Sequence, residues 1–173
     1  FGAATDGQMD ARRALELLKP VLEDRSILKI GHNIKYDMGV FYRYGIALDP
    51  IDDTLLLSYV LDGARFNTLS ELSDHWLGHP GIPIKELIGS GKSQKTLAEV
   101  GIPEAARYAG EDADLTMRLW TLLKPRLAAE SMTTLYETEE RPLTPVLARM
   151  EARGITVDRA ILSPLSGDFR QRA

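Results

Sequence analysis

Three residues have the types and the spacing that metal-assisted hydrolysis would need. Asp37 lies early in a helix predicted for residues 36–44, on the face that carries the apolar side chains, and is expected to point towards the core. Asp112 lies on the apolar stripe of a long predicted helix, one turn after Tyr108. A carboxylate left unpaired on such a face costs about 3 kcal/mol or more, so Asp112 needs a partner, and a metal ion is a good candidate.

The chemistry that fits these residues is cleavage of a phosphodiester assisted by two divalent metal ions. Such a site needs hard oxygen ligands for Mg²⁺ or Mn²⁺ and a group that orients the attacking water. Asp37 and Asp112 could be ligands, and the Tyr108 hydroxyl, one helical turn from Asp112, suits the second task. Spacing alone leaves a simpler interpretation open, in which Asp37 is an acid favoured in the first turn by the helix dipole.

Composition limits the kinds of protein this can be. A length of 173 residues suits one domain, or one domain with part of a second. The chain has no cysteine, which excludes disulfides and thiolate metal sites and favours a cytoplasmic location. No apolar run reaches membrane-spanning length, so we expect no membrane contact. A net charge of −4 argues against a protein that holds nucleic acid by bulk positive charge, but not against one that meets phosphates through metals.

The elements that must position these residues are mostly helices. A short buried strand over residues 26–30 breaks at Gly31, and a second short strand is expected within residues 46–51. Asp53 is predicted to cap the helix that follows it, and Asp158 the last helix of the chain. Helices are predicted at residues 9–23, 36–44, 54–61, 67–77, 103–129 and 131–153, the last of these bent or restarted at its prolines.

One glycine-rich stretch is predicted to carry no site. Residues 78–101 are rich in Gly, Pro, Ser and Lys, which is typical of a solvated connection. Their Gly-Lys-Ser run at 91–93 resembles the end of a phosphate-binding loop, but that motif requires a glycine where this chain has Glu86. The pattern therefore fails, and we expect the stretch to be a connecting loop.

Two motifs and a longer junction resemble one known family, the family A DNA polymerases, which include bacterial DNA polymerase I. Residues 31–37, Gly-His-Asn-Ile-Lys-Tyr-Asp, are similar to the second motif of their 3′–5′ exonuclease domain, Asn-x-x-x-Asp. Residues 108–112, Tyr-Ala-Gly-Glu-Asp, are similar to the third motif, Tyr-x-x-x-Asp. Residues 140–158 resemble the stretch in which these polymerases pass from the exonuclease domain to the polymerase domain. The third motif also fits ribonuclease D-like nucleases, whereas the junction favours the polymerases.

The resemblance implies a fold and an activity. The expected fold is α/β, of the ribonuclease H-like (DnaQ-like) exonuclease type, incomplete at its N-terminus. Residues 1–130 would be a partial 3′–5′ exonuclease domain, and residues 131–173 the helical start of the polymerase domain. The implied activity is removal of nucleotides from a single-stranded 3′ end of DNA, which is proofreading, with Mg²⁺ or Mn²⁺ as cofactor. The implied partners are DNA and the rest of a polymerase chain.

The resemblance also implies roles for single residues. Asp37 and Asp112 would be the metal-associated carboxylates, and Tyr108 would orient the nucleophilic water. At the position of His32, many relatives have Gln. The residues implied to bind substrate are His32 and Asn33, near the 3′-terminal nucleotide, and Arg65, as a phosphate contact or else a free surface arginine.

The chain departs from the family in one motif. The family's first motif, Asp-x-Glu on the opening strand, supplies two further carboxylates, and residues 1–26 contain neither that motif nor a strand to carry it. We therefore expect that the chain starts inside the exonuclease domain, or that the motif is lost, and that the isolated chain is nearly inactive. The alternatives are a catalytically silent exonuclease-like scaffold that supports a polymerase and, as a weaker one, a ribonuclease D-like 3′–5′ exoribonuclease.

Overall fold

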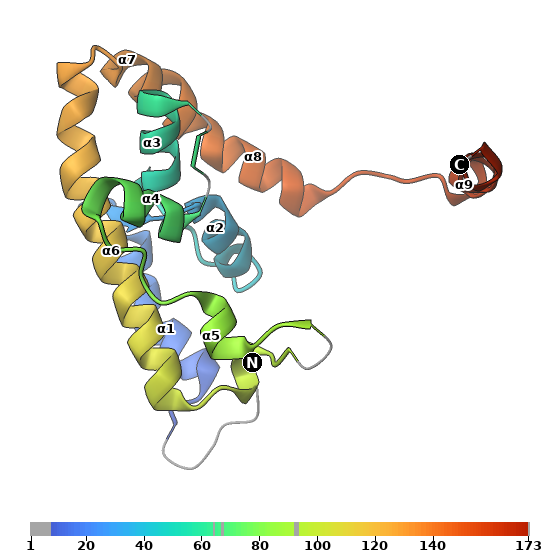
Figure 1. Cartoon of the computed structure of the whole chain (residues 1–173), viewed down its shortest axis with the longest axis horizontal. Coiled ribbons are helices and arrows are strands. Elements are labelled where there is room, and N and C mark those ends of the chain that lie inside the picture. The colour runs from blue at the N-terminus through green and yellow to red at the C-terminus, as the bar shows by residue number, and fades with distance from the viewer. Residues whose placement is uncertain (1–7, 64, 67, 92–93, 173) are drawn as a thin grey trace.

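The computed structural model describes residues 8–63, 65–66, 68–91 and 94–172 (Figure 1). These residues are mostly helical, and none of their helices combines the length and the apolar character needed to cross a bilayer. The helices are α1 (Ala11–Glu23), α2 (Ile34–Tyr42), α3 (Thr54–Asp62), α4 (Leu69–Leu77), α5 (Ile84–Ile88), α6 (Ile102–Ala129), α7 (Thr133–Leu135), α8 (Arg141–Arg153) and α9 (Arg159–Arg172), with a 3-10 turn η2 (Leu97–Glu99) and a π-helical turn η3 (Tyr136–Glu140).

A small parallel sheet holds the start of α2 beside the start of α3. It pairs β1 (Lys29–Gly31) with β2 (Ile51–Asp53), in a register that sets Gly31 opposite Asp53. Both strands lie later in the chain than predicted, and β2 lies mostly outside the predicted range of 46–51. The physical reason is that β2 contains two buried aspartates, Asp52 and Asp53, which an apolar strand pattern does not include. Their burial is compensated by polar partners from other elements.

Helix α6 carries the main hydrophobic core along one face. Its buried leucines step by four residues, and they pack against side chains of α3, α4 and η3. Leu122 is 39% exposed, because the buried leucine that follows Leu119 lies four residues later, at Leu123, and not three. The members of this core are Leu57, Val60, Leu72, Leu119, Leu123, Leu127 and Tyr136.

The two aspartates predicted to cap helices, Asp53 and Asp158, lie at the starts of α3 and α9. Asp53 accepts a hydrogen bond from the backbone N–H of Leu55 at 2.9 Å, which confirms it as the cap of α3. Asp158 accepts from the backbone of Ala160 at 2.9 Å, at the start of α9. Thr68 and Glu71 form a reciprocal capping box at the start of α4, so this helix begins after Thr68.

The helix predicted for residues 131–153 is divided at a different place from the expected one. Its irregular part is the π-helical turn η3, which lies before the prolines and runs into α8 without a gap. Pro142 lies in the first turn of α8, directly after η3. The turn η3 holds Tyr136 in the core with none of its surface exposed. The segment therefore continues through η3 into α8 and does not restart at its prolines.

The connection over residues 78–101 is more structured than predicted. It contains α5 and η2, and its first part is attached to α6 through a carboxylate. Glu111, half-buried, lies 3.0 Å from Nε2 of His79 and accepts a hydrogen bond from the backbone N–H of Ile82 at 2.6 Å. These contacts bind the connection to α6 close to Asp112.

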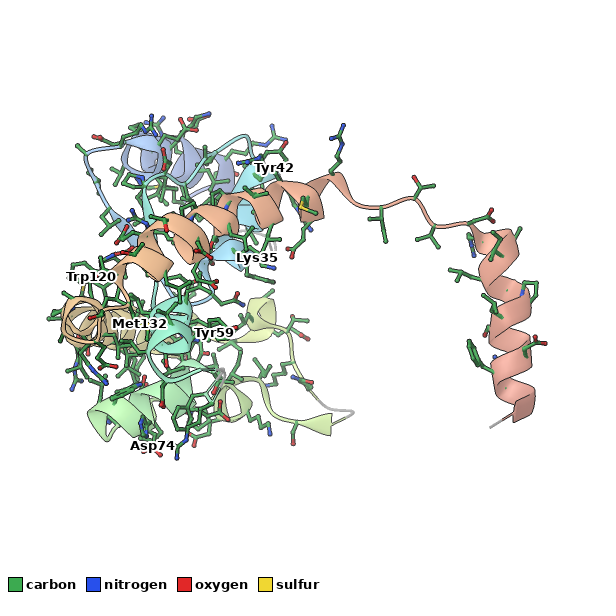
Figure 2. The ribbon with its side chains drawn as sticks, turned by 90° about the horizontal axis from the view of Figure 1, so that it is seen from above. Lys35, Tyr42, Tyr59, Asp74, Trp120 and Met132 are labelled. Atoms are coloured by element: carbon green, nitrogen blue, oxygen red, sulfur yellow. The ribbon has the colours of Figure 1, made fainter. Side chains whose placement is uncertain are left out.

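Helix α8 lies along α2, and α9 stands apart from the rest of the chain (Figure 1). Lys35 of α2 forms an ion pair with Glu151 of α8, and Lys35 and Tyr42 line one hollow together with Ala148 and Glu151 of α8 (Figure 2). Residues 151–170 are all exposed. The part of the chain that packs as one unit thus continues through most of α8.

Candidate active site

A hollow of about 770 Å³ opens between the end of β1, the first turns of α2 and the middle of α6. Asp37 of α2 and Asp112 of α6 both line it, together with His32, Leu69 and Met117. The two aspartates are far apart in the sequence and meet here because β1 delivers the start of α2 against α6. The structure therefore brings together the two residues predicted to be metal ligands.

Asp37 does not point into the core as predicted. Its side chain is exposed and lies on the wall of the hollow, because α2 buries a different face. That face consists of Ile34, Met38 and Phe41, which pack against the apolar residues of β2 and of the loop before it. Asp37 lies beside this face. Partial burial of the carboxyl still raises the pKa of Asp37 above its ordinary value.

Asp112 is half-buried on α6 and has Tyr108 as its neighbour one turn earlier. The Tyr108 hydroxyl lies close enough to the Asp112 carboxylate to favour its charged form. Burial raises the pKa of Asp112, the Tyr108 hydroxyl opposes that rise, and the charge of Glu111 adds to it. Burial and the neighbouring carboxylate also raise the pKa of Tyr108, which keeps its proton on the hydroxyl at neutral pH.

Asp114 behaves as the surface counterpart of Asp112. It lies on the other face of α6 and pairs with Arg118, four residues later, at 3.6 Å, a spacing that brings two side chains together on a helix. The Asp114 side chain is 65% exposed. The two aspartates of α6 therefore differ in environment although they are two positions apart.

The residues implied to contact substrate have three different settings. His32 lines the hollow, and its Nδ1 lies 3.0 Å from Oγ1 of Thr54. Asn33 is exposed and has left-handed backbone angles, with φ of 55° and ψ of 46°. Arg65 is exposed, and its guanidinium lies 5.3 Å from the centre of the Phe66 ring. Of these three residues, His32 is among the described residues that line the hollow, whereas Asn33 and Arg65 are not.

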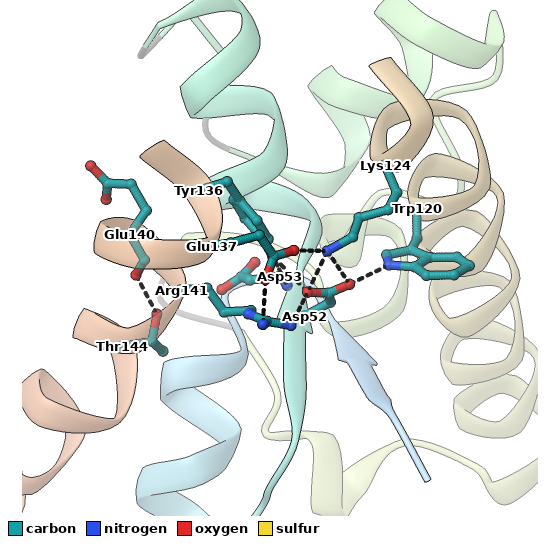
Figure 3. A network of polar contacts seen from close by, with 9 residues as sticks. All are labelled: Asp52, Asp53, Trp120, Lys124, Tyr136, Glu137, Glu140, Arg141 and Thr144. Atoms are coloured by element: carbon teal, nitrogen blue, oxygen red, sulfur yellow. Dashed lines mark hydrogen bonds and ion pairs between the residues drawn. The ribbon is translucent and has the colours of Figure 1, made fainter. Parts of the chain in front are cut away.

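A buried polar network beside the hollow was not predicted (Figure 3). At its centre is Asp52 of β2, which has none of its surface exposed. The Asp52 carboxylate accepts hydrogen bonds from Nε1 of Trp120 at 2.7 Å and from the Tyr136 hydroxyl at 3.1 Å. Nζ of Lys124 lies 2.9 Å from it, and Arg141 lies 3.5 Å away. Both cations also pair with Glu137, so two cations are shared between two carboxylates, and two neutral donors complete the compensation of the buried Asp52.

This network joins β2 and α6 to the continuous stretch formed by η3 and the start of α8. Asp52 belongs to β2, its partners Trp120 and Lys124 belong to α6, and Tyr136 and Arg141 belong to η3 and the start of α8. The backbone N–H of Asp53 also donates to the Tyr136 hydroxyl, at 3.1 Å. The sequence offered one signal for the network, the adjacent acids at the end of a predicted strand, and no indication of the partners.

The hollow offers donors that suit a divalent metal. Asp37 and Asp112 present carboxylate oxygens, the hard ligands that Mg²⁺ and Mn²⁺ prefer. Within the described ranges, no group of three or more His, Asp or Glu side chains is close enough to hold a metal ion. The described residues therefore provide two of the oxygen-bearing side chains that such a site would use.

Comparison with known proteins agrees with the motifs. A family model described as 3′–5′ exonuclease matches residues 2–128. DNA polymerase I of Rhizobium leguminosarum is 55% identical over 173 residues, which is 99% of this chain and 17% of that protein. DNA polymerase I of Pseudomonas aeruginosa is 39% identical over 170 residues, which is 95% of this chain and 19% of that protein. The chain thus spans less than a fifth of the length of these relatives.

Solved structures show the fold. Brucella melitensis NrnC bound to pGG superposes with a TM-score of 0.61 and 24% identity, over 86% of this chain and 67% of that one. The family match and this superposition agree with the ribonuclease H-like (DnaQ-like) fold predicted from the motifs. Because the family model covers well over half of its length, the chain belongs to the 3′–5′ exonuclease family.

Proposed function

We propose that this chain forms part of a 3′–5′ exonuclease that removes nucleotides from the 3′ end of single-stranded DNA, within a protein of the DNA polymerase I type. The observation that carries the proposal is that Asp37 and Asp112 line one hollow, with Tyr108 one helical turn before Asp112. The similarity to DNA polymerase I of two bacteria supports the substrate class. The activity would be proofreading of a newly made strand.

Each residue has a proposed task at the 3′ end of the substrate. Asp37 and Asp112 hold Mg²⁺ or Mn²⁺, which when bound stabilises the charge that develops on the phosphate and activates water. The Tyr108 hydroxyl, one helical turn from Asp112, orients the attacking water. Three further residues contact the substrate: His32 and Asn33 at the terminal nucleotide, and Arg65 at a phosphate.

The domain organisation and location belong to the same proposal. Residues 1–130 form the exonuclease part, and residues 131–173 lead into a polymerase domain that is its partner in the same chain. The packing of α8 along α2 supports a close joint between the two parts. We propose that the protein acts in the cytoplasm, where DNA is available and where a chain without cysteine loses nothing to a reducing environment.

The experiment is digestion of a 5′-labelled single-stranded oligonucleotide with Mg²⁺ or Mn²⁺. This chain is compared with a chain extended at its N-terminus by the preceding segment of the Rhizobium leguminosarum relative, which is 55% identical to it. We expect stepwise shortening from the 3′ end by the extended chain and little or none by this chain alone, which lacks the Asp-x-Glu motif. Asp112→Ala should slow the extended chain by more than about 100-fold, since loss of even an outer-shell partner costs 10- to 100-fold.

Asp114→Ala is the matched control, since Asp114 lies on the same helix but faces solvent. It should cut like the unchanged extended chain. Equal loss in both variants would mean that the helix tolerates no change there, and would contradict the specific role of Asp112. If the extended chain folds and binds the oligonucleotide but never shortens it, the silent-scaffold alternative is correct instead.

A further inference from the structure

The carboxylate of Asp53, at the end of β2, accepts hydrogen bonds from the starts of two helices. Asp53 is 3% exposed, and its Oδ1 accepts hydrogen bonds from the backbone N–H groups of Leu55 at 2.9 Å and Asn33 at 2.8 Å. Its Oδ2 accepts from the backbone N–H of Ile34 at 2.9 Å. Leu55 lies in the first turn of α3, whereas Asn33 is the capping residue of α2 and Ile34 begins that helix. The carboxylate that caps its own helix therefore also binds the first turn of another helix.

Helix α2 depends on this outside partner for its start. Asn33 occupies the capping position, but its side chain makes no capping hydrogen bond to α2. The exposed N–H groups at a helix start need acceptors, and Asp53 supplies them from β2. Its negative charge is also favourable at the positive end of each helix dipole. Asp53 thus does for α2 what a local cap does in most helices.

The turn held in this way has an unusual backbone. Asn33 has φ of 55° and ψ of 46°, a left-handed conformation that only a few residue types adopt easily. This single turn reverses the chain from β1 into α2, and Asp37 lies in the first turn of α2. A change in the backbone angles of Asn33 would therefore swing the direction of α2 and move Asp37 relative to the hollow.

Asp53 is itself fixed from two sides. The backbone N–H of Asp53 donates to the Tyr136 hydroxyl at 3.1 Å, and the register of the sheet sets Asp53 opposite Gly31. The next residue, Thr54, donates from Oγ1 to the backbone carbonyl of Gly31 at 3.2 Å and lies 3.0 Å from Nδ1 of His32. The end of β2 thus holds residues 31–34 at several points.

We infer that Asp53 is a positioning residue, whose carboxylate holds the left-handed turn at Asn33 and thereby sets Asp37 in the hollow opposite Asp112. The effect of Asp53 on the turn is independent of the proposed exonuclease activity. Its importance for metal binding and cleavage rests on that proposed function, through the task given to Asp37. Two measurements distinguish the effect of Asp53 on the turn from its effect on metal binding and cleavage.

The first readout is hydrogen exchange of single backbone amides, measured by NMR on this chain. Asp53→Ser keeps an oxygen that can cap α3 at Leu55 but is too short to reach Asn33 and Ile34. We expect the amides of Asn33 and Ile34 to exchange about tenfold faster or more, while the amide of Leu55 stays protected. Asp53→Asn, which keeps the size of the side chain and one acceptor oxygen, should give a smaller change and serves if the serine variant does not fold.

The matched control is Asp10→Ala, which removes a cap from α1, far from the hollow in the sequence. Asp10 accepts from the backbone N–H groups of Arg12 and Arg13, so its loss weakens a helix start as Asp53→Ser does. It should leave the amides of Asn33 and Ile34 unchanged. Faster exchange at those amides in the control as well would show general loosening and would overturn the inference.

The second readout is binding of Mn²⁺, followed by paramagnetic broadening of the Asp37 and Asp112 signals in the extended chain. Asp53→Ser should weaken Mn²⁺ binding about tenfold or more, as loss of an outer-shell partner does, and slow cleavage with it, whereas Asp10→Ala should change neither. Unchanged Mn²⁺ affinity in a folded Asp53→Ser variant would overturn the positioning role. If the unchanged extended chain neither binds Mn²⁺ nor cleaves, the proposed function fails, and the exchange rates of Asn33 and Ile34 still decide whether Asp53 holds the turn.

Discussion

Asp37 and Asp112 both line the same hollow, and burial raises the pKa of both carboxyl groups. A raised pKa means that the folded chain holds the charged form less readily than the unfolded chain does. The two aspartates therefore weaken the metal-free fold at neutral pH. This is expected of groups kept for binding a cation, because bound metal would compensate the same charge.

The first prediction concerns the charge of Asp112. In the metal-free chain, Asp112→Asn should raise the melting temperature at pH 7 by about 2 °C, since it removes a partly buried charge without changing the size of the side chain. The folded-state pKa is raised, so the destabilising effect of the charge is complete above that pKa. It fades as the pH falls and disappears below about pH 4, where Asp112 is protonated in both states. Thermal unfolding from pH 4 to pH 8 measures this.

Asp114→Asn is the comparison for this measurement. Asp114 is exposed and pairs with Arg118, so its neutralisation should not raise the melting temperature at any pH. A rise that is equal in the two variants would mean that overall net charge, rather than the setting of Asp112, controls the effect.

At the scale of elements, the π-helical turn η3 connects the sheet to α8. Tyr136 is fully buried, and its hydroxyl accepts from the backbone N–H of Asp53 and donates to Asp52. Burial raises the pKa of Tyr136 well above that of a free tyrosine, so the hydroxyl keeps its proton. The ring packs in the core of α3 and α6, while the hydroxyl holds β2. One side chain thus joins apolar packing to the polar network in Figure 3.

The second prediction separates these two contributions. Tyr136→Phe keeps the ring but leaves the buried N–H of Asp53 without its partner, which should lower the free energy of unfolding by about 2 kcal/mol. Urea denaturation measures the change. Tyr59→Phe is the control, because Tyr59 is 47% exposed, and should change stability by less than about 0.5 kcal/mol. Equal stability of the two variants would mean that the hydroxyl of Tyr136 contributes nothing.

At the scale of the whole molecule, the segment after residue 130 has two different parts. Residues 133–153 contribute Tyr136 and Thr144 to the buried interior and pack along α2, whereas the described side chains of α9 are exposed. The domain division predicted at residue 130 stays a prediction. The packing of the described residues continues past this position, through η3 and most of α8.

The third prediction follows from this packing. A chain ended at residue 130 loses the buried Tyr136 ring and its polar network, and loss of a buried aromatic side chain costs about 3–5 kcal/mol. Its melting temperature should fall by about 10 °C or more. A chain ended at residue 158 removes only α9 and should melt within about 2 °C of the full chain. Circular dichroism measures both, and equal melting of the two shortened chains would contradict the packing described here.

Several features of the site could be predicted because they depend on local spacing. Tyr108 and Asp112 are four residues apart on a helix, so their contact follows from helix geometry wherever the helix lies. The capping of α3 by Asp53 is local for the same reason. The motif resemblance added the expectation that Asp37 would join Asp112, and the hollow contains both. The catalytic, metal-binding and substrate-contact roles of these residues stay predictions.

Other features depended on which surfaces meet. Asp37 was expected to face the core, but α2 buries the face of Ile34 and Met38, because β2 and the preceding loop cover that side. The spacing of Asp37 fits two neighbouring faces, and only the packed partner selects one of them.

The sequence by itself determined the longer helices, the caps of α3 and α9 and the acids on the helices, since these follow from residue types within a few positions of one another. Tertiary structure alone decided that Asp52 is buried among donors from α6, η3 and α8, and that the Asp53 carboxylate holds the start of α2 as well as its own helix. A buried charge is stable only where several distant groups converge on it. That convergence is a property of the packed chain and leaves no periodic pattern in the sequence.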